Sequence, residues 1–161
     1  MEITERLLLL YKMNLKTVLY GQCETYVYKR LQTIQEIISS NQKALQSETK
    51  SSAGDKHETG RAMLQLEMEK AGQQLVTITL MKETLAKIDL SKSSKIIHLG
   101  SLITTDKANF FLSISAGQLK VNNENYFAVS VSSPIGKLLL GKRENDRLVF
   151  NGKQIQIQEV F

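Results

Sequence analysis

Hydrophobic residues recur every three or four positions along two stretches in the first half of the chain. In residues 59–89 the repeat is regular and includes Leu64, Met68, Ala71, Leu75, Ile78, Met81, Leu85 and Ile88. In residues 15–48 the polar Asn41 and Glu48 continue an apolar repeat made of Leu19, Cys23, Tyr26, Leu31, Ile34, Ile38 and Leu45. Such spacing predicts helices whose apolar stripes pack on each other. The sequence therefore predicts a long antiparallel coiled-coil hairpin.

An eleven-residue polar segment, Ser51 to Arg61, separates the two helical stretches. Because the stretches are expected to pack antiparallel, this segment is predicted to be the tip of the hairpin. It contains two carboxylates, Asp55 and Glu58. Solvated surface is the commoner explanation for an acidic pair in a polar loop. A hairpin tip is nevertheless the part of such a protein that can enter another molecule's cavity.

After a Ser- and Lys-rich joint at residues 89–95, the pattern changes from helical to β. Turn signals separate short β-prone runs at 96–104, 109–115, 126–131, 147–150 and 154–160, which predict a small antiparallel sheet. Alternation in the last run puts Ile155 and Ile157 on one face, with Glu159 as a possible continuation. Residues 133–141 predict a short helix over the sheet, because Ser133 can cap it, Pro134 suits its first position and Gly141 can close it.

The chain has 161 residues, a formal net charge of +5 and one cysteine. We expect an extension at 1–12, a coiled-coil domain at 13–92 with its tip at 49–60, and a β domain at 93–161. Cys23 cannot form an internal disulfide, which fits a reducing, cytoplasmic setting. The apolar run from Leu7 to Leu10 is too short for a membrane span or a secretory signal.

Several kinds of chemistry are not expected from these residues. Two histidines and one cysteine cannot supply four closely spaced zinc ligands. The sequence shows no paired nucleophile and base and no phosphate-binding glycine loop, so an independent enzyme is not expected. Cationic residues cluster late in the chain, and such a cluster is more often a solvated face than a nucleic-acid surface: Lys137, Lys142, Arg143 and Arg147.

The segment SPIGKLLLGKREND, from Ser133 to Asp146, and the later NGKQIQIQEV resemble the C-terminal signature of the bacterial Gre transcript-cleavage factors, GreA and GreB. The order of parts is similar too, and Gly54, Asp55 and Glu58 match the acidic motif of the Gre coil tip. The resemblance covers the chain from about Leu15 onward. It implies an α+β fold, in which a long antiparallel helical hairpin precedes a small FKBP-like antiparallel β domain with one short helix.

The resemblance also implies a function. A transcription elongation factor of this family binds RNA polymerase and inserts its coil tip into the secondary channel. It would be a cytoplasmic monomer with no membrane partner. There Asp55 and Glu58 would help the polymerase hold a shared Mg²⁺ ion and cleave its own backtracked RNA, so the protein needs no cofactor by itself. Further residues are candidates for contacts to polymerase or to the RNA 3′ end: His57, Thr59, Arg61, Lys137, Lys142 and Arg143.

The tip departs from the family pattern after Glu58. The family usually continues Asn-Ala-Glu-Tyr, whereas this chain has Thr59-Gly60-Arg61-Ala62. A channel-binding regulator without cleavage activity is therefore an alternative. An FKBP-type isomerase or chaperone is a third possibility that rests on the fold alone, and the chain lacks the tryptophan that usually floors an isomerase pocket.

Overall fold

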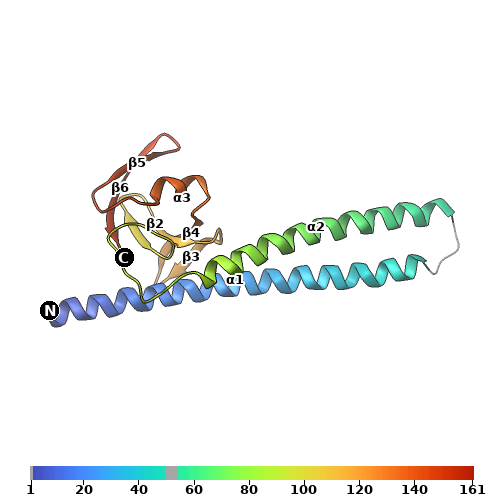
Figure 1. Ribbon diagram of the computed structural model, residues 1–161, viewed down its shortest axis with the longest axis horizontal. Coiled ribbons are helices and arrows are strands. Elements are labelled where there is room, and N and C mark those ends of the chain that lie inside the picture. The colour runs from blue at the N-terminus through green and yellow to red at the C-terminus, as the bar shows by residue number, and fades with distance from the viewer. Residues whose placement is uncertain (1, 50–53) are drawn as a thin grey trace. The chain divides into compact units, whose positions relative to one another are not determined.

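The computed structural model describes the backbone of residues 2–49 and 54–161, and the side chains of these residues except 48–49 and 54–57. Its elements are shown in Figure 1: α1 (Ile3–Thr49), α2 (Gly54–Ala86), β1 (Leu102–Thr105), β2 (Asn109–Ser113), β3 (Gly117–Val121), β4 (Glu124–Ser130), α3 (Pro134–Leu139), β5 (Arg147–Phe150) and β6 (Lys153–Val160). The order confirms the predicted α+β class, with two long helices ahead of a six-stranded sheet and one short helix.

The chain forms two compact units. The helical unit comprises residues 26–82, and the β unit comprises residues 1–25 together with 83–161. The division falls inside both long helices, whereas the predicted boundary at residue 92 marks the change of sequence pattern. Residues 3–12, expected as an extension, form the first turns of α1.

The two helices of the helical unit pack along the predicted seam. On α2 the seam positions Leu64, Met68, Ala71, Leu75, Ile78 and Met81 are all buried or half-buried, whereas Leu66, Val76 and Leu80 on its outer side are exposed. On α1, Ile34 and Asn41 are buried. A fully buried aliphatic side chain such as Ile78 contributes about 1.5–3 kcal/mol. The helical pairing predicted from the repeat is therefore confirmed.

The sheet has the strand order β3-β4-β2-β1-β6-β5. Four strand pairs are antiparallel, as predicted, but β2 and β4 run parallel. The difference arises from β3, which the sequence did not predict because its side chains are mostly exposed and show no buried face. Since β3 forms a hairpin with β4, it reverses the chain between β2 and β4.

The predicted alternation of the last strand holds through Ile155 and Ile157, which are buried. It then shifts, because Thr104 pairs with Glu159 while Thr105 pairs with Ile157. This irregularity is a bulge that gives β6 one extra residue. As a result, Val160 is buried and Glu159, a possible continuation of the apolar face, is exposed.

Helix α3 covers the core of the β unit. Its capping agrees with the prediction: Ser133 is the N-cap, Pro134 occupies the first turn, and the Gly136 amide donates to Ser133 Oγ at 3.1 Å. Residues of the strands, of α3 itself and of the segment before β1 form this core: Ile97, Ile103, Phe110, Leu112, Ile135, Leu139, Leu148, Ile155, Ile157 and Val160. Gly141, with φ of +82°, follows the helix in a backbone conformation that favours glycine.

The part of α1 up to Thr25 belongs to the β unit, and its side chains Leu15, Leu19 and Cys23 are buried. Gln22 Nε2 donates to the Lys120 carbonyl at 3.0 Å, and Cys23 Sγ lies 3.7 Å from Ser113 Oγ. Burial raises the pKa of the Cys23 thiol to about 11. These contacts hold the start of α1 on the sheet.

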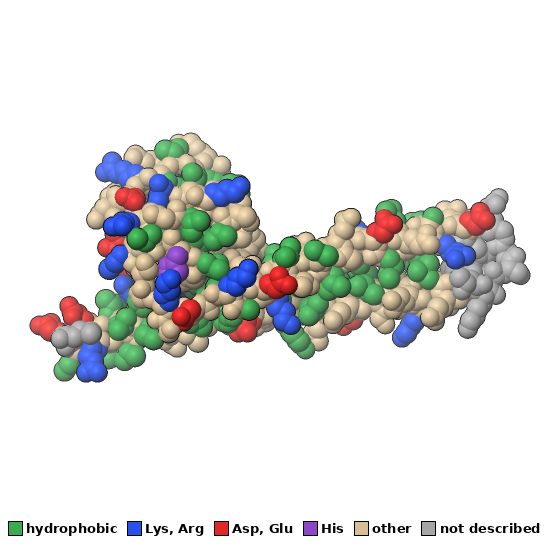
Figure 2. All heavy atoms as spheres, viewed as in Figure 1, with side chains coloured by type: hydrophobic (Ala, Val, Ile, Leu, Met, Phe, Trp, Pro, Cys, Tyr) green, Lys and Arg blue, Asp and Glu red, His purple; other side chains and the backbone are tan. Residues whose placement is uncertain are grey.

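The first turns of α1 expose large hydrophobic side chains. Ile3, Leu7, Leu8 and Leu10 are each more than half exposed, and Figure 2 shows hydrophobic side chains gathered at this end of the chain. Between residues 2 and 49 and between 54 and 161, no helix has a stretch long and apolar enough to cross a membrane.

Lys16, on the part of α1 that belongs to the β unit, is 1% exposed. Its ammonium donates to the Lys92 carbonyl at 3.3 Å and lies 4.9 Å from the centre of the Phe161 ring. Burial lowers the Lys16 pKa to about 8, and the attraction of Asp89 partly offsets this effect. The burial of this side chain was not predicted, because a lysine interrupts the apolar pattern at position 16.

We expect Lys16 to make the folded state more stable as the pH rises from about 8 toward 10.5. In that interval the buried amine is neutral in the folded protein but charged in the unfolded chain, so the unfolded state binds more protons. With allowance for nearby solvent, the gain is about 1–2 kcal/mol. Lys16→Met should remove it, as urea midpoints at pH values from about 7 to about 10 would show.

The comparison with Lys16→Met isolates this contribution. Cys23 titrates in the same range with the opposite sign, because its raised pKa lets the folded state hold a proton that the unfolded chain loses. That effect is common to both proteins and cancels in their difference. If the urea midpoints of the wild type and of Lys16→Met change with pH in the same way, Lys16 does not cause the rise in stability.

Candidate functional site

The end of the hairpin, where α1 gives way to α2, is the candidate site. Helix α1 ends at Thr49 and α2 begins at Gly54. Asn41 on α1 faces Glu67 on α2, which fixes how the two helices pair. Glu58 lies nine residues before Glu67, about 14 Å farther along the helix. Asp55 and Glu58 therefore belong to the first turns of α2, beyond the paired seam.

The predicted tip was too long. Residues 54–58 were expected in a polar tip before the second helical stretch at 59–89, but they are helical and belong to α2. Gly54 and Gly60 disfavour a helix by propensity. A helix can still form there, because acidic residues in a first turn interact favourably with the helix dipole. The described helices are therefore longer than predicted, with α1 ending at Thr49 and α2 beginning at Gly54.

The structure describes some of the predicted tip side chains and leaves others outside its described part. Glu58, Thr59 and Arg61 are exposed on α2. The side chains of Asp55 and His57 lie outside the described part of the chain, although their backbone is helical. Positions 55 and 58 are three residues apart, a spacing that brings two positions to one side of a helix. Two carboxylates alone cannot complete the coordination of a metal ion, so a cation at these positions would have to be held largely by another molecule.

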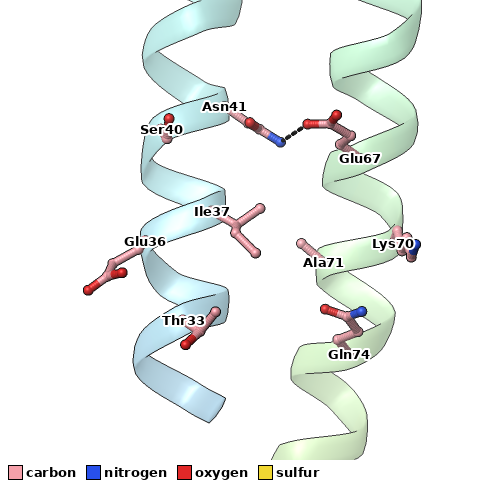
Figure 3. A pocket seen from close by; sticks show the side chains of 9 residues that line it. All are labelled: Thr33, Glu36, Ile37, Ser40, Asn41, Glu67, Lys70, Ala71 and Gln74. Carbon is pink, nitrogen blue, oxygen red and sulfur yellow. Dashed lines mark hydrogen bonds between the residues drawn. The ribbon is translucent and has the colours of Figure 1, made fainter. Parts of the chain in front are cut away.

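A groove between the two helices lies behind this end of the hairpin (Figure 3). It has a volume of about 560 Å³ and is lined by Thr33, Glu36, Ile37, Ser40, Asn41, Glu67, Lys70, Ala71 and Gln74. Asn41 Nδ2 donates to Glu67 Oε2 at 3.1 Å, and Asn41 is only 7% exposed. The predicted polar position in the seam is thus paired across the helices. Glu67 as its partner was not predicted, because it lies outside the apolar repeat.

We expect Asn41→Leu to stabilise the helical unit by about 1–2 kcal/mol, because added apolar burial outweighs one hydrogen bond to an exposed carboxylate. The expected cost is weaker control of the helix register. Urea unfolding followed by circular dichroism measures the change. Glu67→Gln, which keeps an acceptor oxygen, should change stability by less than about 0.5 kcal/mol. A loss of stability in Asn41→Leu would show that the hydrogen bond contributes more than burial.

The cations that cluster late in the sequence lie on different parts of the β unit. Lys137 is exposed on α3, and Lys142 is half-buried in the segment that follows. Arg143 is exposed, with its amide donating to Asp146 Oδ2 at 2.8 Å and its backbone bridging to Ile96. Arg147 opens β5 and lines a hollow with Lys107 and Lys153, two residues that were not predicted.

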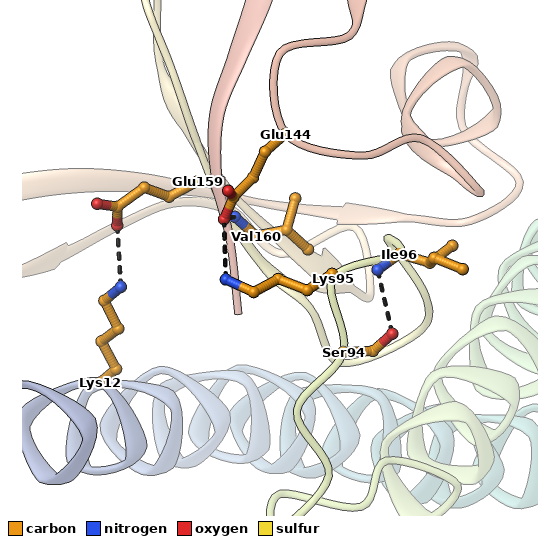
Figure 4. Close-up of polar contacts among 7 residues, drawn as sticks. All are labelled: Lys12, Ser94, Lys95, Ile96, Glu144, Glu159 and Val160. Carbon is orange, nitrogen blue, oxygen red and sulfur yellow. Dashed lines mark hydrogen bonds and ion pairs between the residues drawn. The ribbon is translucent and has the colours of Figure 1, made fainter. Parts of the chain in front are cut away.

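Polar contacts near the C-terminus neutralise several other charges of the β unit (Figure 4). Lys12 Nζ lies 3.0 Å from Glu159 Oε2, and Lys95 Nζ lies 3.4 Å from Glu144 Oε1. Glu144 Oε1 also accepts a hydrogen bond from the Val160 amide, and this bond is the main reason that the Glu144 pKa is lowered. These residues fasten the last strand to α1 and to the joint after α2.

Within the residues that the structure describes, no three His, Cys, Asp or Glu side chains come together to hold a metal ion. No family model matches the chain, and no curated protein matches it. A similar solved structure is that of the transcription factor Gfh1, which is 18% identical. The match covers 87% of this chain and 90% of that chain, with a TM-score of 0.33.

Proposed function

We propose that the protein is a Gre-like transcription elongation factor, which binds RNA polymerase and inserts the end of its α1–α2 hairpin into the secondary channel. There it would stimulate the polymerase to cleave backtracked RNA. The proposal draws on the Gre-like motifs at residues 54–58 and 133–160 and on an element order that agrees with them.

The observation that carries the proposal is the position of the acids. Asp55 and Glu58 lie in the first turns of α2, and Glu58 is exposed. Behind them, residues 26–49 of α1 form an arm of about 35 Å that pairs with α2 through a buried seam. A paired arm of this kind is narrow and ordered, so it can carry its end groups into a confined channel.

In this proposal the chain only positions carboxylate groups in the active site of the polymerase. A Mg²⁺ ion shared with the polymerase would supply charge neutralisation and an activated water for hydrolysis of the phosphodiester. Asp55 and Glu58 would contribute carboxylate oxygens, which are the ligands that this hard cation prefers. Two carboxylates cannot complete its six-fold coordination, so activity is expected only inside the polymerase.

A second candidate is a channel-binding regulator that does not promote cleavage. Arg61 favours this alternative, because it is exposed on α2 three residues after Glu58. An acid and a base at this spacing attract each other. The guanidinium would then compete with a metal ion for the Glu58 carboxylate and leave the hairpin end poorly suited to hydrolysis.

Sizing of RNA in stalled, backtracked polymerase complexes tests both candidates. The complexes are incubated with the protein and Mg²⁺, and binding is measured in parallel by co-migration of labelled protein with the polymerase. Faster RNA shortening supports the cleavage factor. Binding that slows nucleotide addition without shortening the RNA supports the regulator. A failure to bind polymerase would remove both candidates.

A further inference from the structure

We propose that the exposed side of the β5–β6 hairpin, with the neighbouring β1–β2 turn, is a binding site for the backbone phosphates of a nucleic-acid strand. Lys107, Arg147 and Lys153 surround a hollow of about 600 Å³ whose other lining residues are Asp106, Gln154 and Gln156. Figure 2 shows Lys and Arg side chains over this end of the β unit. The site lies in the β unit and does not depend on the function proposed for the hairpin end.

The strand register explains how Arg147 comes together with the two glutamines. Arg147 is paired with Gln156, and Val149 is paired with Gln154, so alternate residues of β5 and β6 share one face. On the opposite face, Leu148 and Ile155 are buried in the core. Burial of that face therefore forces Arg147 and the two glutamines outward.

The β1–β2 turn brings the third cation to the same place. The Asp106 amide donates to the Gln156 carbonyl at 3.1 Å, and the Gln156 amide donates to Asp106 Oδ1 at 2.9 Å. These two bonds hold Asp106, and with it the adjacent Lys107, beside β6. Because Asp106 and Gln156 are 50 positions apart in the chain, the sequence alone gives no sign that Lys107 lies near Arg147.

The positive charges around the hollow are poorly compensated. Over residues 2–49 and 54–161, neither Arg147 nor Lys153 takes part in an ion pair. Lys107 Nζ is 3.9 Å from Asp106 Oδ2, a long contact between exposed groups. By contrast, Lys12 and Lys95 in the same unit have closer carboxylate partners. Three cations against one carboxylate give the hollow a local positive potential.

Phosphate groups fit this arrangement better than other anions of similar size. An arginine offers a planar fork of donors that matches two phosphate oxygens, and lysines add point charges nearby. The amides of Gln154 and Gln156 can donate to sugar or phosphate oxygens. Val149, which is 63% exposed beside them, adds an apolar contact. The hollow is open, so it suits a strand that lies across it.

Fluorescence anisotropy with a fluorescein-labelled RNA of about 16 nucleotides tests the site on the full-length protein. The same titrations with single-stranded DNA, duplex DNA and poly-glutamate separate the sources of negative charge. Each is repeated at about 50 and 200 mM KCl, because release of counterions makes phosphate binding depend on salt. The test variant is Lys107→Ala/Arg147→Ala/Lys153→Ala. A matched control, Lys82→Ala/Lys87→Ala/Lys120→Ala, removes the same charge from exposed positions elsewhere.

The wild-type affinity is expected to fall with salt, with a log–log slope of about −2 for three phosphates on a single strand. The test variant should lose at least about tenfold in affinity at low salt and most of that slope. The control should change affinity by less than about threefold. Circular dichroism of both variants establishes that they are folded.

Three results would overturn the proposal. The first is no nucleic-acid binding by the wild type at low salt. The second is an equal loss of affinity in the control, which would mean that overall charge and not this hollow attracts the strand. The third is tighter binding of poly-glutamate than of either nucleic acid, which would point to an acidic protein partner.

Discussion

Replacing Asp55 with Asn, or Glu58 with Gln, is expected to abolish the stimulated cleavage of backtracked RNA while polymerase binding persists. Each substitution keeps the size of the side chain and removes the charge that a hard cation requires of its ligand. We expect the stimulated rate to fall by at least about 100-fold. Time courses of RNA shortening, with the unstimulated polymerase as the lower limit, measure the effect.

Glu69→Gln is the matched control for these substitutions. Glu69 is exposed on the same helix, eleven residues after Glu58, and the change removes one charge. The control should cleave at the wild-type rate. Full stimulation by both tip variants would contradict a role for the two acids. An equal loss in the control would show that the overall charge of α2, and not its first turns, matters.

Gly136→Ala is expected to destabilise the β unit by at least about 3 kcal/mol, or to prevent it from folding. A Cβ at this position would overlap the carbonyl oxygen of Ser130. That carbonyl cannot easily move, because it accepts hydrogen bonds from the Ser133 amide at 3.2 Å and from Ser133 Oγ at 2.7 Å. Thermal and urea unfolding, followed by the fluorescence of the tyrosines, measure the loss.

Gly72→Ala provides the contrasting control. Gly72 lies within α2, and a Cβ there would meet nothing within 4 Å. Alanine favours a helix by about 1 kcal/mol relative to glycine, so this variant should be slightly more stable than the wild type. Similar stability changes in the two variants would contradict the argument, because both replace a helical glycine and only one creates an overlap.

The sequence predicted the paired helices well and their end poorly, for one physical reason. Between Leu64 and Met81 the seam residues of α2 are covered by the partner helix, and this burial imposes a repeat that can be recognised. Before Leu64 no such repeat remains, and the polar character of residues 51–61 indicated a tip segment between the helices. The helix nevertheless begins at Gly54.

The β unit was predicted in outline, and its errors concern residues whose burial depends on distant contacts. The β3 strand was missed because it has no buried face, and Lys16 was missed because a lysine in a helix normally faces water. The acids at positions 55 and 58 were noticed in the polar tip segment, but only the resemblance to a family gave them a role, since an acidic pair has no pattern of its own. Lys107 and Arg147 meet only through the folded sheet.

The buried thiol of Cys23 makes the protein convenient to label. Its side chain is fully buried and its pKa is raised to about 11, so a maleimide at neutral pH encounters almost no thiolate there. A cysteine introduced at an exposed position such as Thr59 would then react alone. Fluorescent or spin probes could be attached at one chosen point while the native cysteine stays in place.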